Sequence, residues 1–235
     1  MANHLDLEEQ EQLDQLKHFW KQYGNAITWA LIVFLGAFGG WNFYQYWQRS
    51  QAAQASAMYD EMTRVVKSND AAKIDRVFAD MKDKFGATTF AQQAGLLVAK
   101  QYYSAGNVDA AKLALTWVAD KSSDPGYQAI AKLRLAGVLM ESKAFDDALK
   151  QLSGNFPADF EALVADRKSD IYVLQGKKAE ALVEYAKSFK RFDEGTQYRR
   201  LVEVKMNALG VDPQSTSQNP VDRVAVNGAT SEGKK

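Results

Sequence analysis

The stretch QYGNAITWALIVFLGAFGGWNFYQYWQ, residues 22–48, contains no charged side chain and is flanked by Lys21 and Arg49. An α-helix rises about 1.5 Å per residue, so about 20 apolar residues cross the hydrocarbon core of a bilayer. The part from Ala26 to Tyr46 is long enough to do so. Because the chain beyond it is polar and has helical periodicity, the stretch predicts one transmembrane helix that carries one soluble domain.

Aromatic side chains gather at both ends of this stretch. Trp20 and Tyr23 precede it, and five more close it: Trp41, Phe43, Tyr44, Tyr46 and Trp47. Amphipathic rings favour the boundary between membrane and water, so the pattern predicts two aromatic belts around a span that contacts the lipid bilayer.

Two glycines inside the stretch, Gly36 and Gly40, form a G-x-x-x-G pair. Glycines four residues apart let a second helix approach closely, so the pair is a candidate contact with another transmembrane helix. Small residues are also common in membrane helices that have no such partner, and this alternative stays open.

The segment before the span is acidic at first and then amphipathic. Apolar residues recur in it at helical spacing: Leu13, Leu16, Phe19, Trp20 and Tyr23. The pattern fits either a helix in the headgroup region, with a bend at Gly24-Asn25, or a plain helical start to the anchor. Lys17 and Lys21 before the span balance Arg49 and Arg64 after it, so the positive-inside rule selects no direction across the bilayer.

Composition argues against several classes of function. The chain has 29 basic and 29 acidic residues, which is unfavourable for a nucleic-acid partner. It has no cysteine, and its only histidines are His4 and His18, so the common metal and nucleophile motifs are missing. Asp166 and Asp170 share a helix face, but adjacent basic residues favour a solvated or paired face over acid–base catalysis. We expect a protein that is not an enzyme and that uses no cofactor or metal.

The soluble region has a repeating helical pattern. Periodicity predicts helices over residues 51–67 and 71–85, three hairpins over 90–119, 127–152 and 160–192, and a last helix over 197–209. Alanines recur in the second helix of each hairpin, 37 and then 33 residues apart: Ala111, Ala148 and Ala181. A small residue stands twelve positions before each of them: Ala99, Ala136 and Ser169. Small side chains are needed where two helix backbones cross closely.

This pattern resembles the tetratricopeptide repeat, whose period is about 34 residues. Gly95 and Lys132 depart from it, because that repeat often has tryptophan at these positions. The predicted fold class is therefore all-α, with a single N-terminal transmembrane helix followed by a tetratricopeptide-repeat-like solenoid. The expected organisation is an amphipathic segment over 1–24, the span over 25–47, the repeat domain over 48–210 and a disordered tail over 211–235.

Solenoids of this kind bind partners on a concave surface formed by the first helix of each hairpin. Helical phase predicts eight residues on that surface: Leu96, Lys100, Tyr103, Leu133, Met140, Leu163, Asp170 and Val173. Their mixture of apolar and polar side chains suits contacts with peptides or proteins. In the alternative interpretation, neighbouring helices cover many of them or they are merely solvated.

Several motifs together resemble the YfgM-like ancillary subunits of the bacterial SecYEG translocon. They are L-x-x-L-K-x-F-W-K-x-Y-G over 13–24, Trp41 and Trp47 at the end of the anchor, Leu133-Arg134-Leu135-Ala136, Ala165-Asp166-Arg167 and Lys205-Met206-Asn207. The resemblance implies a single-pass protein of the bacterial inner membrane, with a cytoplasmic N-terminus and a periplasmic repeat domain.

The resemblance also implies partners. These are the SecYEG translocon, translocating polypeptides and a membrane-anchored periplasmic chaperone related to prolyl isomerases. The expected function is that of a non-enzymatic translocon accessory subunit that holds such a chaperone or an emerging polypeptide near the channel. The alternative is a membrane-anchored scaffold that regulates an envelope stress response through its acidic N-terminal segment.

Overall fold

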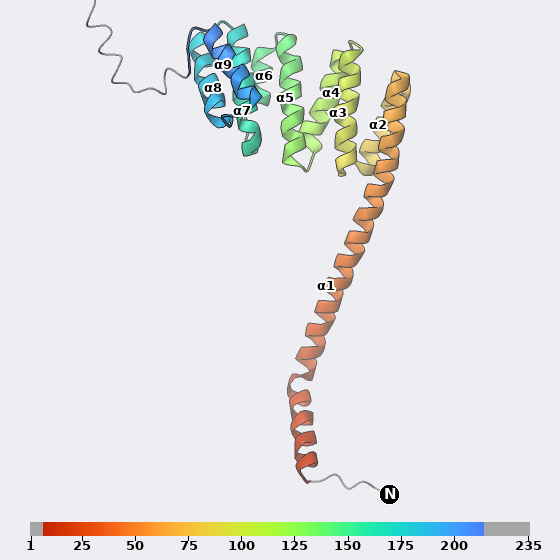
Figure 1. Ribbon diagram of the computed structural model, residues 1–235. Helices are drawn as coiled ribbons and strands as arrows, with labels where there is room; N and C mark the ends of the chain where they lie inside the picture. The colour runs from red at the N-terminus through yellow and green to blue at the C-terminus, as the bar shows by residue number, and fades with distance from the viewer. Residues whose placement is uncertain (1–6, 214–235) are drawn as a thin grey trace, which may run out of the picture. The chain divides into compact units, whose positions relative to one another are not determined.

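The computed structural model describes residues 7–213, and the predicted disordered tail lies outside this range from position 214 onward. Within the described residues the chain is built from helices α1 to α9 and contains no strand (Figure 1). The predicted all-α class is confirmed. Contacts divide the chain into a unit that ends at Gln54 and a unit that begins at Ala55, and each is described separately.

The first unit consists of most of α1 (Leu7–Ser68), which continues through the predicted span. Among the described helices, α1 alone is long and apolar enough to cross a membrane. Its large side chains, such as Trp29, Phe34 and Phe38, are more than half exposed, as a lipid-facing surface requires. A separate helix beginning near position 51 was predicted, but α1 runs on to Ser68 because no glycine or proline interrupts it after Gly40.

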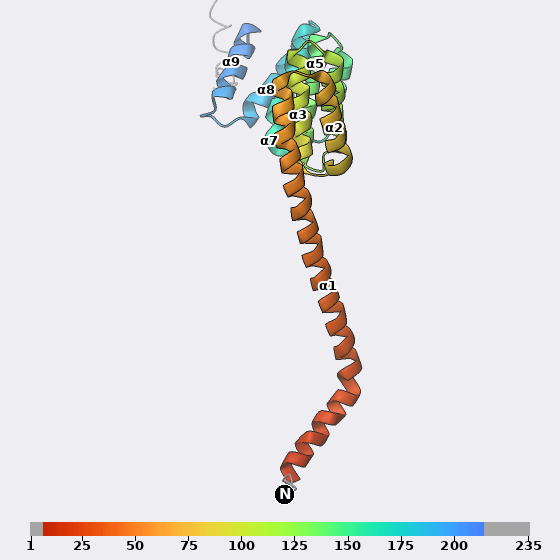
Figure 2. The same cartoon turned by 90° about the vertical axis from the view of Figure 1, so that its right-hand side faces the viewer.

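The helix α1 bends in its N-terminal part (Figure 2). The Thr28 hydroxyl donates a hydrogen bond to the Gly24 carbonyl oxygen at 2.7 Å, and the Trp20 indole packs against Gly24. A glycine and a threonine that bonds back to the preceding turn are both established causes of helix bending. The residues predicted to mark a bend therefore lie in a helix that stays continuous.

The second unit stacks the remaining helices on the end of α1. They are α2 (Ala71–Phe85), α3 (Thr89–Ser104), α4 (Val108–Lys121), α5 (Pro125–Glu141), α6 (Phe145–Gln151), α7 (Ala158–Leu174), α8 (Lys178–Arg191) and α9 (Gln197–Ala208). The three predicted hairpins are α3–α4, α5–α6 and α7–α8, and α9 packs on α8 as the last helix (Figure 1).

Small residues lie at the helix crossings, as predicted. Ala111, Ala148 and Ala181 are fully buried, and so is Ala136. Ser169 is also fully buried, and its hydroxyl donates to the Ala165 carbonyl oxygen at 2.9 Å, so the polar group is satisfied. Small, fully buried side chains are what a close approach of two helices requires.

Gly95 shows why one repeat lacks the expected tryptophan in its first helix. The space beside this glycine is filled by Trp117 from α4 and Phe78 from α2, whose rings meet edge to face with centroids 5.5 Å apart. A β-carbon on Gly95 would lie only 2.4 Å from Cγ2 of Val118. The Trp117 indole on α4 therefore fills the space that a tryptophan on α3 would occupy. The glycine on α3 lets α4 approach closely.

We expect Asp124→Ala to destabilise the repeat domain by about 1 kcal/mol. The Asp124 carboxylate accepts hydrogen bonds from the backbone N–H groups of Gly126, at 2.7 Å, and Tyr127, at 3.3 Å, at the start of α5. Urea unfolding of the full-length protein in detergent, followed by circular dichroism, measures the change. Asp124→Asn retains a capping oxygen and is the control, so equal stabilities for the two variants would contradict this role.

Candidate protein-binding surface

A groove of about 470 Å³ opens on the first helices of the three hairpins, and residues of α3, α5 and α7 line most of it. Its lining consists of Ala99, Lys100, Tyr103, Leu115, Leu133, Arg134, Gly137, Val138, Glu141 and Arg167. Figure 1 shows α3, α5 and α7 following one another along the stack, so the groove runs across successive repeats. We call it the repeat groove.

The floor of the repeat groove is apolar and its rim is polar. Leu115 and Val138 are buried and Leu133 is half-buried, which leaves an apolar strip along the bottom. At the rim, the Tyr103 hydroxyl donates to the Glu141 carboxylate and so links α3 to α5. This hydrogen bond to a carboxylate raises the pKa of Tyr103 above its ordinary value.

Three cationic side chains also line the groove, one from each first helix: Lys100, Arg134 and Arg167. Gly137 lies beneath Arg167, since a β-carbon on this glycine would be 3.7 Å from Nη1 of the arginine. A surface with an apolar floor and charged groups above it can hold an extended peptide.

The eight residues predicted for the binding surface are distributed over three environments. Lys100, Tyr103 and Leu133 line the repeat groove. Leu96 is 8% exposed and lies in the main core cluster, Met140 packs against the second core cluster, and Leu163 is half-buried. Val173 is exposed near the end of α7, and Asp170 belongs to a polar cluster described below.

Sequence reasoning missed three charged residues of the groove, Arg134, Glu141 and Arg167, and it also missed Gly137. A signal for the two arginines was present. Arg134 and Arg167 are 33 residues apart and each stands two positions before a small residue of the repeat, so the repeat register places them on the same side of successive helices. The proximity of Arg167 to Gly137 depends on the packing of α5 against α7 and could not be read from spacing.

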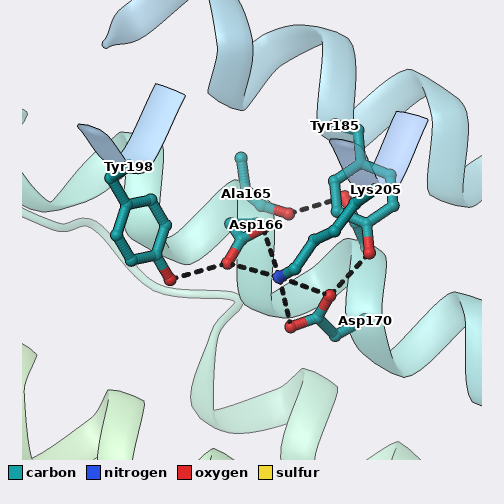
Figure 3. Close-up of polar contacts among 7 residues, drawn as sticks. Ala165, Asp166, Asp170, Tyr185, Tyr198 and Lys205 are labelled. Atoms are coloured by element: carbon teal, nitrogen blue, oxygen red, sulfur yellow. Dashed lines mark hydrogen bonds and ion pairs between the residues drawn. The ribbon is translucent and has the colours of Figure 1, made fainter. Parts of the chain in front are cut away.

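A polar cluster joins α7, α8 and α9 (Figure 3). The Lys205 ammonium from α9 lies 2.8 Å from Oδ1 of Asp166 and 2.8 Å from Oδ1 of Asp170, both on α7. The Tyr185 hydroxyl donates to Asp170 at 2.6 Å, and the Tyr198 hydroxyl donates to Asp166 at 2.9 Å. The two aspartates predicted to share a helix face do so, and they are ion-paired.

The tyrosines of this cluster are held in their neutral form. Burial, together with the Asp166 carboxylate, raises the pKa of Tyr198 to about 12. Burial and the hydrogen bond to Asp170 raise the pKa of Tyr185 as well. The carboxylates thus receive bonds from one ammonium and two phenols, and the cluster ties the last helix to the repeat before it.

Comparison with known proteins places the chain in a family. A family model described as a tetratricopeptide repeat-like domain matches residues 17–211. The ancillary SecYEG translocon subunit of Neisseria gonorrhoeae is 31% identical over 210 residues, which cover 89% of this chain and 100% of that protein. The chain belongs to the YfgM-like family of ancillary SecYEG translocon subunits.

Two further relatives bear the same description. The ancillary SecYEG translocon subunit of Haemophilus influenzae is 31% identical over 209 residues, covering 86% of this chain and 98% of its own. The one of Escherichia coli is 26% identical over 206 residues, covering 86% and 97%. No solved structure matches. Together with the single apolar helix, membership of the family fits a membrane-anchored, single-pass protein.

Three of the motifs that carry the resemblance to the YfgM-like family, those in the repeat domain, contribute to the two sites described above. Asp166 of Ala165-Asp166-Arg167 binds Lys205 of Lys205-Met206-Asn207 in the polar cluster. Arg167 of the first motif and Arg134 of Leu133-Arg134-Leu135-Ala136 line the repeat groove. One motif on α7 therefore contributes to both the stabilising cluster and the candidate binding surface.

Proposed function

We propose that the protein is a non-enzymatic accessory subunit of the SecYEG translocon whose repeat domain binds a periplasmic chaperone or translocating polypeptides. The observation that carries the proposal is the repeat groove, an apolar strip with polar rims on a domain attached to a membrane helix. The relatives, which are described as ancillary SecYEG translocon subunits, support the association with the translocon.

The proposed topology has residues 1–24 in the cytoplasm, 25–47 in the membrane and 48–210 in the periplasm. The resemblance to the family supports this direction, whereas the charges flanking the span are balanced. A reporter enzyme that is active only in the periplasm, fused to the C-terminus, tests the direction. Activity of a reporter that works only in the cytoplasm would overturn it.

The anchor supplies a possible contact with the channel. β-carbons placed on Gly36 and Gly40 would meet no atom within 4 Å, so this face of α1 is open to a transmembrane helix of the translocon. The repeat groove would then act close to the exit of the channel, because the anchor limits how far the domain can move from it.

We expect a photoreactive amino acid at Tyr103, on the rim of the groove, to form adducts with a periplasmic chaperone or a secreted polypeptide. Tyr103 is 40% exposed, so the substitution disturbs little packing. Leu113 on α4 is 73% exposed and does not line the groove, which makes the same substitution there the matched control. Adducts are identified by mass spectrometry after irradiation of cells.

The same cells provide the test of translocon association. Purification of the unmodified protein in mild detergent is expected to recover translocon subunits. Recovery without any of them, or equal adducts at positions 103 and 113, would contradict the proposed function.

A further inference from the structure

Three cationic side chains line the repeat groove. Some other lysines and arginines of the domain pair with nearby acids, as in Lys112–Asp109 at 3.6 Å and Arg191–Glu161 at 2.6 Å. Lys100, Arg134 and Arg167 make no ion pair or hydrogen bond within residues 7–213. Three positive charges from three successive first helices therefore line one groove without an ion pair in this part of the chain.

One carboxylate also lines the groove and offsets part of this positive charge. Glu141 receives the hydroxyl of Tyr103. With three cations and one carboxylate, the lining has a net charge of +2, although the whole chain has a net charge of zero. Such a local excess of positive charge favours an anionic partner.

The geometry of the arginines suits carboxylates. Arg134 and Arg167 hold equivalent positions in successive repeats, and Arg167 extends over Gly137, one helical turn beyond Arg134 on α5. The missing side chain at Gly137 leaves the surface of α5 open beside the guanidinium. A guanidinium presents a planar fork of donors that binds a carboxylate with two parallel hydrogen bonds.

We propose that the repeat groove binds an extended acidic peptide segment, whose carboxylates contact Arg134, Arg167 and Lys100 while an apolar side chain lies on Leu133 and Val138. This proposal rests on the proposed function and adds the chemistry of the partner. An apolar floor beneath a cationic rim fits a peptide better than a nucleic acid or a free ion, because only a peptide offers alternating acidic and apolar side chains.

The test uses the full-length protein in mild detergent and fluorescent peptides of ten residues. The first peptide alternates glutamate with leucine and has an amidated C-terminus, and the second replaces every glutamate with glutamine. The third is the glutamine peptide with a free C-terminal carboxylate. Fluorescence anisotropy at two salt concentrations measures affinity, and we expect tighter binding of a carboxylate-bearing peptide that weakens as salt rises.

Variants then locate the binding site. A double variant with Arg134→Gln and Arg167→Gln loses charge-assisted hydrogen bonds to the peptide. We expect it to bind the acidic peptide roughly tenfold more weakly or worse. Arg76→Gln with Arg200→Gln makes the same change in charge at exposed positions outside the groove and should leave the affinity unchanged. Gly137→Leu fills the groove and should also abolish binding, while circular dichroism shows whether each variant remains folded.

Each outcome bears on the proposal. If the glutamate peptide binds, the groove recognises carboxylates of side chains. If only the third peptide binds, the groove recognises the carboxylate at the end of a chain. Both results support the proposal. Equal binding of the amidated glutamine peptide, or an equal loss in the control variant, overturns it. If position 103 still forms adducts but the peptides bind equally with and without carboxylates, the proposed function stands and the preference for acidic peptides is wrong. If position 103 also forms no adducts, the proposed function is wrong as well.

Discussion

Lys205→Met is expected to destabilise the C-terminal part of the repeat domain by about 3–5 kcal/mol, the usual cost of removing one partner of a buried ion pair. Asp166 is 1% exposed and keeps its negative charge away from water, so the Lys205 ammonium 2.8 Å away is its main compensation. The substitution retains most of the length and the apolar stem of the side chain and removes the ammonium with its hydrogen bonds. The loss should therefore report the electrostatic role of Lys205 rather than a cavity.

Urea unfolding followed by circular dichroism, and limited proteolysis read by mass spectrometry, measure this effect in the full-length protein. Because each repeat contacts only its neighbours, we expect early cleavage around α9 while the hairpins nearer the anchor stay protected. Lys190→Met, at an exposed lysine on α8, is the control and should change stability by less than about 0.5 kcal/mol. Unfolding of Lys205→Met at the wild-type urea concentration would contradict the assignment.

Gly95→Ala is expected to destabilise the domain by about 1–3 kcal/mol, although alanine is normally the better residue inside a helix. The new β-carbon would lie 2.4 Å from Cγ2 of Val118 and 3.4 Å from both Phe78 and Trp117. Since α3 and α4 are packed at this point, the clash can be relieved only by moving one helix or by a strained rotamer.

The matched control is Gly137→Ala on α5. There the added β-carbon meets Nη1 of Arg167 at 3.7 Å, an ordinary contact with a flexible side chain, so the intrinsic helix preference should raise stability by about 0.5–1 kcal/mol. Urea unfolding measures both variants. Val118→Ala combined with Gly95→Ala should recover part of the loss, and an absence of coupling between them would refute the close contact as its cause.

Much of the fold was predictable because its signals are local. An uncharged run of suitable length indicates a transmembrane helix in any chain, and the spacing of small residues locates the helix crossings at Ala111, Ala148 and Ala181. The start of α5 at Asp124-Pro125 is likewise a property of a few adjacent residues. The continuity of α1 beyond the span is harder to predict, because the sequence changes there from apolar to polar residues, and such a change does not by itself end a helix.

The candidate site was less predictable, because each of its features joins residues from different helices. Helical phase placed Leu96 on the binding surface, but a helix in the middle of a stack is covered on more than one side, so Leu96 lies in the core. The same reasoning placed Asp170 there, whereas Lys205, 35 positions later in the chain, draws it into the polar cluster.

The sequence by itself determined the membrane helix, the all-α repeat architecture and the pairing of helices into hairpins, since each depends on composition or on spacing within a few turns. Only the tertiary structure decided which charges are compensated. Lys205 and the two aspartates of α7 meet because α9 packs on α8, whereas Arg134 and Arg167 line one groove from α5 and α7 without an ion pair in residues 7–213. Charge compensation depends on distances of a few ångströms between remote residues, which no local pattern encodes.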